Sequence, residues 1–476
     1  MTTTDLTAGP SADRLTPDLL KLAAVVTLGA IMVSLDATMT NVALNTFLRD
    51  FHAPLTIIQW VGTGYLLSMA TVIPLTGWAA QRFGARTVWM CCLGAFLAGS
   101  LLCGMAWSAG SLIAFRVVQG IGGGMILPLG QAVIAQAAGP NRLGRVMAAV
   151  GIPSALGPVL GPVLGGLLVT DASWRWIFYI NVPVCLTALA LSWRIMPTAK
   201  APGRSALDVI GLLLLSPAFA TIVYGLAEAG RVGRFDHGAT LLALSVGVGL
   251  LVAFVVHALR ASAEPIIDLR LFRIRSFATS QAVVFLAGTV LFGAMGALPL
   301  YYQQARGYTA LHTGLLLVPM GLGMGVSLMA AGRLADRLPP RPIALVGLAL
   351  SGGASLVYTQ LGAHTSQLLI AATLVASGAG IGAVLVPVMA ASVRGLNSHA
   401  IPRATTASRI FLQLGGSLGA AVVLIVLSRQ IAGRVTPTGR PSSADLAAAF
   451  GHTFWWVLAF AALAAVPALL LPGSKE

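Results

Sequence analysis

The chain has 476 residues, of which 57 % are apolar and only 9 % are charged, and its mean hydropathy is +0.88. A soluble domain carries roughly 25 % charged residues, so this composition excludes a water-facing surface over most of the chain and predicts a protein dissolved largely in lipid. The net charge of +15 suggests nucleic-acid binding, but no basic cluster is interleaved with aromatic residues on a polar face, so no nucleic-acid partner is expected.

Apolar runs of about 20 residues, separated by charged or Pro/Gly turns, predict membrane-spanning helices. Fourteen such runs lie at 22–47, 57–80, 87–107, 109–137, 143–169, 176–196, 207–227, 238–258, 276–303, 310–335, 342–361, 365–393, 402–428 and 450–471. The third and fourth runs nearly touch, and Pro153, Pro158 and Pro162 interrupt the fifth, so twelve and thirteen spans are the neighbouring counts. The prediction is an all-α membrane protein with 14 transmembrane helices.

The distribution of basic residues predicts the orientation of this bundle. Of the 29 Lys and Arg, 19 fall in the N-terminus, alternate loops and the C-terminus, 8 fall in the opposite loops, and 2 fall within helices. This asymmetry follows the positive-inside rule and places both termini in the cytoplasm. The stretch up to Leu20 lacks the basic start and cleavage site of a signal peptide, so the first run is expected to be retained as a helix. A multi-pass protein of the inner membrane is expected, with the lipid bilayer as a partner.

An internal repeat relates the two ends of the chain. GWAAQRFGAR (Gly77–Arg86) and GRLADRLPPR (Gly332–Arg341) share Gly, Ala, Arg and a final Arg at a constant offset of 255 residues. Parallel repeats of six helices are typical of the major facilitator fold, which places a substrate cavity between two halves. The predicted division is a cytoplasmic segment, an N-terminal six-helix bundle, two inserted helices, a C-terminal six-helix bundle and a cytoplasmic tail, at 1–21, 22–200, 201–262, 263–472 and 473–476.

Two opposite charges are predicted inside the membrane. Asp36 lies about 21 Å along the first helix and Arg116 roughly 10 Å into the fourth, at 1.5 Å per residue. The two helices run in opposite directions, so both residues fall in the outer half of the membrane, where pairing costs less than isolation. A carboxyl that is alternately wet and paired gains and loses a proton, which is the elementary requirement of proton antiport. A structural Asp that only fixes helix packing, or a static ion pair, is the alternative.

The first helix also carries a polar stripe on the side opposite Asp36. Its members, at spacings of four, three and four residues, are Ser34, Thr38, Asn41 and Asn45. A helix that is polar on both sides is predicted to be central, with one side toward the cavity and the other against a neighbouring helix. The stripe is therefore interpreted either as cavity lining or as interhelical hydrogen bonding.

Further polar, flexible or aromatic residues are candidates for the cavity wall. Arg409, with Gln413 four residues later, lies in the thirteenth predicted helix and either compensates a substrate charge or binds helix-end carbonyls. Tyr65, Met125, Tyr301 and Met320 are adaptable candidates, with ordinary helix packing as the alternative for each.

No Walker loop, nucleophile–His–acid set or metal spacing is found, so an ATP-driven pump, an enzyme, a cofactor and a metal site are not expected. The cysteines are expected to be free buried thiols.

Several motifs resemble those of the fourteen-helix branch of the drug:proton antiporters in the major facilitator superfamily. They are LDATMTNVAL (35–44), Arg116 followed by QGIGGG (119–124), GPVLGPVLGG (157–166), WRWIFYINVP (174–183) and LYYQQARGYTA (300–310), and they cover essentially the whole chain. The arrangement at 174–183 is the most specific of these matches. Two positions depart from the pattern. Asn45 replaces a usual Pro, and Gln81 replaces the usual acid, which puts a charge-dependent latch at that loop in doubt.

This resemblance implies roles for individual residues. Asp36 would carry coupling or substrate recognition and Arg116 proton transfer, and Gln119 belongs to the fourth-helix motif. The remaining motif residues would act in gating: Gly77, Arg82, Gly84, Arg86, Gly157, Pro158, Gly161, Gly165, Gly166, Gly332, Asp336 and Arg337.

The function predicted from the sequence is export of lipophilic drugs or natural products, cationic ones among them, in exchange for protons. Such a protein would give antibiotic resistance by multidrug efflux, and a monomer is expected. A lipid or glycolipid translocase on the same scaffold is the first alternative. A membrane receptor or assembly scaffold without a transport cycle is the second, and it is weakened by the lack of a sizeable soluble region.

Overall fold

The computed structural model describes residues 16–138, 146, 157, 160–161, 163–197, 207–260, 265–397, 400–434 and 441–473. Over these residues the secondary structure is helical, without a strand. The first part of the chain forms α1 (Pro17–Val42), α2 (Leu44–Phe51), α3 (Leu55–Val72), α4 (Leu75–Phe83), α5 (Ala85–Gly104), α6 (Ala109–Ala138), a helical stretch at 163–171, α8 (Trp176–Tyr179) and α9 (Asn181–Ile195).

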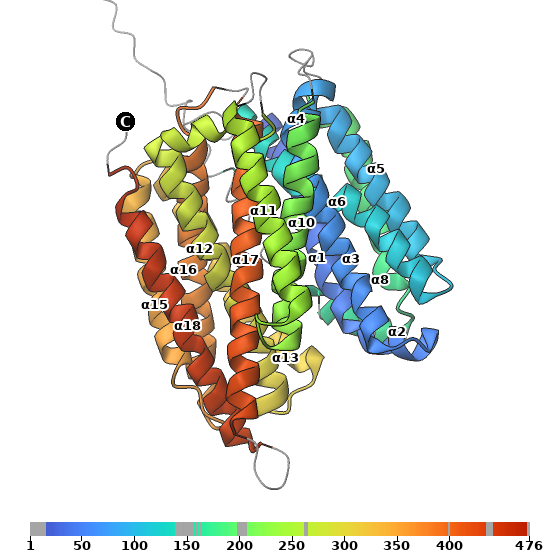
Figure 1. Cartoon of the computed structure of the whole chain (residues 1–476), viewed down its shortest axis with the longest axis vertical. Coiled ribbons are helices and arrows are strands. Elements are labelled where there is room, and N and C mark those ends of the chain that lie inside the picture. The colour runs from blue at the N-terminus through green and yellow to red at the C-terminus, as the bar shows by residue number, and fades with distance from the viewer. Residues whose placement is uncertain are drawn as a thin grey trace, which may run out of the picture.

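Two long helices, α10 (Val209–Val232) and α11 (Gly238–Arg260), connect this part to the second. The second part comprises the 3₁₀ turn η2 (Leu269–Arg273), α12 (Arg275–Leu300), the π-helical turn η3 (Tyr301–Ala305), α13 (Ala310–Leu316), α14 (Val318–Ala335), α15 (Pro340–Tyr358), α16 (Gln367–Val393), α17 (Ile401–Ala432) and α18 (Ser443–Leu469). Figure 1 shows α10 and α11 lying in front of the junction between the two parts.

Most of the predicted spans coincide with observed helices. Twelve described helices are long and apolar enough to cross a membrane, and α3 with α4 forms a thirteenth candidate that is bent by 56°. Pro74, which precedes α4, marks the break, as expected because proline removes a backbone donor. The predicted span at 143–169 falls mostly outside the described residues, so a count of fourteen stays a prediction.

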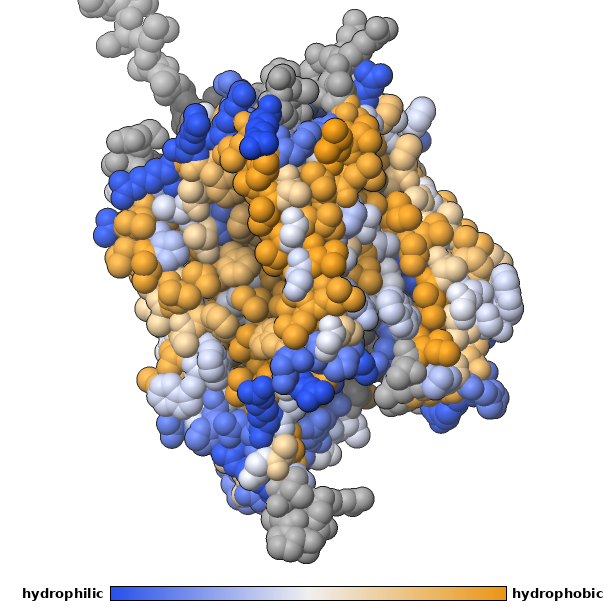
Figure 2. Space-filling model, viewed as in Figure 1, coloured by the Kyte–Doolittle hydropathy of each residue, from blue (hydrophilic) through white to orange (hydrophobic). Residues whose placement is uncertain are grey.

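The surface of the molecule carries an apolar belt. Figure 2 shows hydrophobic residues across the middle of the bundle and hydrophilic residues gathered at its two ends. The exposed large side chains in this belt include Leu213, Leu242, Val252 and Val326. Such a belt is the surface that lipid tails cover, and the chain is therefore a multi-pass membrane protein.

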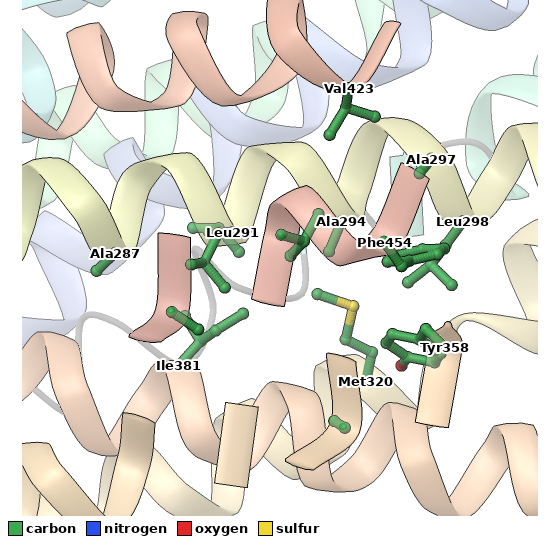
Figure 3. Close-up of a cluster of buried hydrophobic side chains, with 14 of the residues drawn as sticks. Ala287, Leu291, Ala294, Ala297, Leu298, Met320, Tyr358, Ile381, Val423 and Phe454 are labelled. Carbon is green, nitrogen blue, oxygen red and sulfur yellow. The ribbon is translucent and has the colours of Figure 1, made fainter. Parts of the chain in front are cut away.

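Each part of the chain has its own apolar core. In the first part, Trp89, Leu93, Phe96 and Ile126 are buried between α1, α5, α6 and α9. In the second part, buried side chains from α12, α14–α16 and α18 meet, and Figure 3 shows Met320, Tyr358 and Phe454 pointing toward one another.

A third apolar cluster joins the two parts near one end of the bundle. It contains Ile73, which follows α3, Ala135 of α6, Phe219 of α10, and Ala404 and Ala407 of α17. Ile73 and Ala135 lie where α3 and α6 end, and Ala404 and Ala407 lie where α17 begins, while Phe219 lies in the middle of α10. The cluster therefore extends from the middle of the bundle toward the end at which α1 starts and α18 finishes. We call this cluster the inter-half seal. It holds the two parts together on the side that the sequence predicts to be cytoplasmic.

Candidate functional site

The carboxylate of Asp36 is the centre of a buried polar network. Asp36, Arg116 and Gln119 have no exposed surface. Arg116 Nη1 donates to Asp36 Oδ2 at 2.6 Å, which forms the ion pair expected from the depths of the two residues. Asp36 Oδ1 accepts from Gln119 Nε2 at 2.9 Å and from Asn181 Nδ2 at 3.0 Å. Both carboxylate oxygens are thus engaged inside the membrane.

A second layer of contacts fixes the partners of Asp36. The Ser100 hydroxyl accepts from Gln119 Nε2 at 3.1 Å and from Asn181 Nδ2 at 3.0 Å, and it donates to the carbonyl of Phe178 at 2.9 Å. Gln119 Oε1 in turn accepts from Arg116 Nη1 at 2.8 Å. The network therefore connects α1, α5, α6 and the α8–α9 segment. A change in the charge of Asp36 alters hydrogen bonds to all of these elements at once.

Arg116 is held on its other side by an aromatic ring. Its guanidinium carbon lies 3.9 Å from the centroid of the Tyr65 ring on α3, and Nε lies 3.4 Å from the carbonyl oxygen of Val61. A ring face attracts a cation most strongly where water is excluded. Tyr65, a candidate for the cavity wall with helix packing as the alternative, is buried here, and its ring lies against the arginine.

Asn181 and Ser100 were not predicted as site residues. Asn181 opens α9 within WRWIFYINVP, the most specific of the matched motifs, but no role follows from the motif alone. Ser100 is a lone hydroxyl in an apolar helix, and such residues are common at helix contacts. In the sequence, Asn181 stands out only as an amide within an apolar run. Nothing in the sequence indicates that its side chain reaches Asp36, which is 145 residues away along the chain.

Replacing Asn181 by Ala is expected to weaken the network without removing its charges. Asp36 Oδ1 then loses one of its donors, and hydrogen bonds to charged groups contribute roughly 1.5–3 kcal/mol. We expect a lower thermal unfolding temperature in detergent and a several-fold slower export. Thr187→Ala is the matched control, because Thr187 is exposed on the same helix and donates only to its own backbone, at Pro183. Equal unfolding temperatures and equal export rates of the two variants would contradict a role for Asn181 in the Asp36 network.

The polar stripe on α1 packs against a glycine segment. A Cβ atom placed on Gly157 would lie 2.1 Å from Ser34 Oγ, and one on Gly161 would lie 1.9 Å from Thr38 Oγ1. Thr38 Oγ1 also donates to the carbonyl of Gly157 at 3.2 Å. These glycines therefore allow close backbone approach, and the arrangement favours the interhelical interpretation of the stripe over cavity lining.

The other residues of the stripe and of the glycine segment are less informative. Gly165 approaches the Met39 backbone, whereas nothing lies within 4 Å of a Cβ on Gly166. Pro158 and the side chains of Asn41 and Asn45 lie outside what the structure describes.

Two aromatic or flexible cavity candidates lie in the core of the second part. Tyr301 is buried and its hydroxyl donates to the carbonyl of Gly362 at 2.8 Å, while Met320 is only 7 % exposed. Both side chains pack between α12, α14 and their neighbours, which favours the packing alternative over a place in a cavity wall. Met125 is half-buried against the core of the first part.

Arg409 and Gln413 differ from these residues. Both are half-buried on α17, and neither has a hydrogen bond or ion pair within the part of the chain that the structure describes. Arg409 lies eight residues from the start of α17, about 12 Å along the helix. Gln413 follows one turn later on the same side.

The loop after the second span contacts the other half of the protein. Arg403 at the start of α17 donates from Nη2 to Gln81 Oε1 at 3.0 Å, and a Cβ on Gly77 would lie 3.3 Å from the Arg403 side chain. A neutral amide thus occupies the position of the usual acid and still bridges the two halves. Gly84 ends α4 with a φ of 84°, which a residue with a side chain rarely adopts.

The remaining gating candidates differ in position and exposure. Arg86 donates to the carbonyl of Trp193, in the first part, and lies over the Trp193 ring. Arg82 and Arg337 are exposed, Gly332 is buried in α14, and Asp336 ends that helix and is half-buried.

Changing Gln81 to Glu is expected to strengthen the contact with Arg403. The hydrogen bond then becomes a charge-assisted one, which is roughly twice as strong. Because this contact lies beside the inter-half seal, we expect slower export and a larger population of the conformation closed at this end, measured by spin-label distances across the seal. Gln360→Glu, which adds the same charge on an exposed turn, is the control. Faster export by Gln81→Glu would contradict this role.

Comparisons with known proteins agree with this architecture. The family described as the Major Facilitator Superfamily matches residues 26–420. The chain is 40 % identical over 420 residues to the "Multidrug resistance protein B homolog" of Mycobacterium tuberculosis, covering 88 % of this chain and 78 % of that protein. It is 31 % identical over 430 residues to the "Methylenomycin A resistance protein" of Streptomyces coelicolor, covering 89 % and 88 % of the two chains.

Solved structures share the fold at lower sequence identity. The proton:xylose symporter XylE superposes with a TM-score of 0.64 at 14 % identity, covering 94 % of each chain. The human organic anion transporter MFSD10 superposes with a TM-score of 0.62 at 17 % identity, covering 94 % of this chain and all of that one. Identities this low show the fold alone. Together with the family match over most of the sequence, they show that the chain is a transporter that belongs to the Major Facilitator Superfamily.

Proposed function

We propose that the protein exports lipophilic drugs or natural products in exchange for protons, by alternating access between its two halves. The observation that carries this proposal is the buried Asp36–Arg116 pair, in which a titratable carboxylate lies inside the membrane 2.6 Å from its cation. Ionisable residues at such depth are expensive and usually functional. The names of the Mycobacterium and Streptomyces relatives, both resistance proteins, support drugs as the cargo.

Protonation of Asp36 is the step that couples the gradient to movement in this mechanism. A neutral carboxyl no longer compensates the desolvation of the Arg116 charge. The guanidinium then keeps only its contacts with the Tyr65 ring, Gln119 and the Val61 carbonyl. The α1 helix then loses its strongest attachment to α6 and α9. Because the opposite side of α1 packs on the glycine segment, we expect this loss to shift α1 relative to that segment.

The position of the inter-half seal indicates from which end of the bundle a proton would reach Asp36. With the two halves joined at the end that carries the start of α1 and the finish of α18, access is expected from the opposite end. If both termini are cytoplasmic, as the distribution of basic residues predicts, this conformation faces outward. We propose that residues 22–200 and 263–472 rock as two bundles around the substrate, with residues 201–262 as an inserted pair, and that the protein acts as a monomer.

The proposal is tested in cells that lack their own efflux pumps. Expression of the protein is expected to raise the tolerated concentration of at least one compound in a panel of cationic, neutral and acidic antibiotics. Collapsing the proton gradient with a protonophore should then restore accumulation of that compound to the level of cells without the protein. Accumulation is read from fluorescence or from radiolabelled compound.

Two outcomes would contradict the proposal in different ways. Export that continues undiminished without a gradient excludes proton coupling while leaving efflux intact. Unchanged tolerance across the whole panel, with the protein present in the membrane, contradicts drug export itself. None of the relatives described above is named as a lipid translocase, and that alternative is not proposed.

A further inference from the structure

The helix α17 lies in the interior of the bundle. Between Ile401 and Leu427 none of its residues is exposed, and Figure 1 shows the helix between α10 and the helices of the second part. Other parts of the protein therefore cover most of this stretch. Arg409 and Gln413 are half-buried, so part of each side chain is left uncovered by its neighbours.

Several helices pack against α17. Ser408 accepts from Gln281 Nε2 of α12 at 2.9 Å, and the backbone of Gly415 lies against the carbonyl of Phe285 on the same helix. Further along, Leu424 contacts Gly230 of α10. The ring of Phe411 lies 5.7 Å from that of Phe272 in η2.

Arg409 projects away from the side of α17 that carries Phe411. It is two residues before Phe411, and at 100° per residue their side chains leave the helix in nearly opposite directions. The same side carries Gln413 and, two turns after Arg409, Gly416, on which the half-buried ring of Phe292 rests. A cation, an amide and an aromatic ring thus lie together on one half-buried face of α17.

The charge of Arg409 is not balanced within the described residues. An arginine presents five donors and keeps its charge at every physiological pH. The other arginine inside a span, Arg116, is paired with Asp36, whereas no described acid lies within contact of Arg409. An unpaired charge at this depth is costly, so we expect an anion to supply the missing partner during the transport cycle.

The acids of the spanning helices already have partners. Asp36 pairs with Arg116, and Glu228, near the end of α10, accepts from Arg231 at 2.7 Å. Asp208 caps α10 by accepting from the Gly211 amide at 2.8 Å and lies 2.8 Å from His257. In the part of the chain that the structure describes, a cationic substrate therefore finds no free carboxylate inside the membrane, whereas an anionic one finds Arg409.

We propose that Arg409 and Gln413 form the recognition site for an acidic group, and that the exported substrates are lipophilic acids or zwitterions. The Arg409 guanidinium would bind a carboxylate or a phosphonate by two parallel hydrogen bonds, as its planar fork allows. The Gln413 amide would donate a third hydrogen bond, and the Phe292 ring would contact the apolar body of the substrate. This inference rests on the proposed export function and replaces the expectation of cationic cargo.

The local field of Arg409 is tested without knowledge of the substrate. Gln413→Cys is introduced into a protein whose four native cysteines are replaced by Ala. Its rates of modification by anionic sulfonatoethyl and cationic trimethylammonioethyl methanethiosulfonate are then compared in proteoliposomes. We expect the anion-to-cation rate ratio to fall about tenfold when Arg409→Gln is added, because a nearby charge concentrates ions of opposite sign. Arg409→Lys should restore the ratio, and Arg429→Gln, at the exposed end of the same helix, should leave it unchanged.

Either of two results overturns the inference. A ratio that is the same with and without the charge of Arg409 means that this residue does not attract anions. A Gln413→Cys thiol that reacts with neither reagent means that the face is not accessible. Neither result affects the proposed export function, which is judged by gradient-dependent tolerance in cells and by the Asp36→Asn variant.

The substrate class is tested with three probes that share one apolar body. Pyrenebutyrate, pyrenebutanol and a pyrenebutyl trimethylammonium salt are titrated into the intact protein in nanodiscs and followed by pyrene fluorescence. We expect the carboxylate to bind at least tenfold more tightly than the alcohol, and this preference to disappear in Arg409→Gln but not in Arg429→Gln. Equal binding of the three probes, tighter binding of the cation, or a preference that survives Arg409→Gln would overturn the assignment.

Discussion

We expect that replacing Asp36 by Asn abolishes gradient-driven export, while the protein still inserts in the membrane. Asparagine keeps the size of the side chain and can still accept from Gln119 or Asn181, so the packing of α1 is preserved. It cannot exchange a proton, and it gives Arg116 no opposite charge. The proton therefore has no site at which its binding changes the attachment of α1.

The measurement is uptake or efflux in proteoliposomes with an imposed pH gradient, for a compound identified in the antibiotic panel. Asp18→Asn is the matched control, because Asp18 is on the same helix, is 92 % exposed and pairs only with Lys21. We expect this control to export at the wild-type rate. Retained gradient-driven export by Asp36→Asn would move the coupling role to another residue.

Removing the cation instead of the acid should destabilise the protein as well as stop export. Arg116→Gln leaves Asp36 buried with only amide donors, and breaking a buried pair by removing one partner costs up to about 3–5 kcal/mol. Protonation of the stranded carboxyl reduces this cost, because a neutral group is cheaper to bury. We expect a thermal unfolding temperature clearly below that of the wild type, measured in the same detergent, and a smaller deficit at acidic pH.

A double variant separates the stability of the pair from its function. Asp36→Asn combined with Arg116→Gln buries two neutral amides in place of two charges, so its unfolding temperature should lie above that of Arg116→Gln alone. Export should stay absent, because no group takes up the proton. A double variant as unstable as Arg116→Gln would mean that Arg116 acts through packing on Tyr65 rather than through its charge.

The composition and pattern of the sequence predicted the membrane fold and the position of the central pair. Apolar runs of the right length coincide with described helices because the bilayer imposes one length on every span. The Asp36–Arg116 contact was predictable for a related reason. Antiparallel helices of known length place two residues at comparable depth, and two opposite charges in lipid have few other ways to lower their energy.

The partners of this pair were decided by the tertiary structure. Ser100 and Asn181 reach Asp36 because α5 and α9 both pack beside α1, and no periodicity within a single helix encodes which neighbour that is. Tyr65, Tyr301 and Met320 show the same limit, since an aromatic or flexible residue suits a cavity wall and a packed core equally well. Composition cannot distinguish these two environments.

The low charge content of the chain shows, from the sequence alone, that most of the protein lies in lipid. Any charge inside the membrane is therefore expected to need a partner. Whether it has one depends on which helices face each other, and only the tertiary structure shows this. Arg116 meets Asp36 because α6 packs on α1, whereas the side of α17 that carries Arg409 meets no described acid. The physical reason is that pairing is a short-range interaction between residues far apart in sequence, so it is set by packing and not by the residues' own helices.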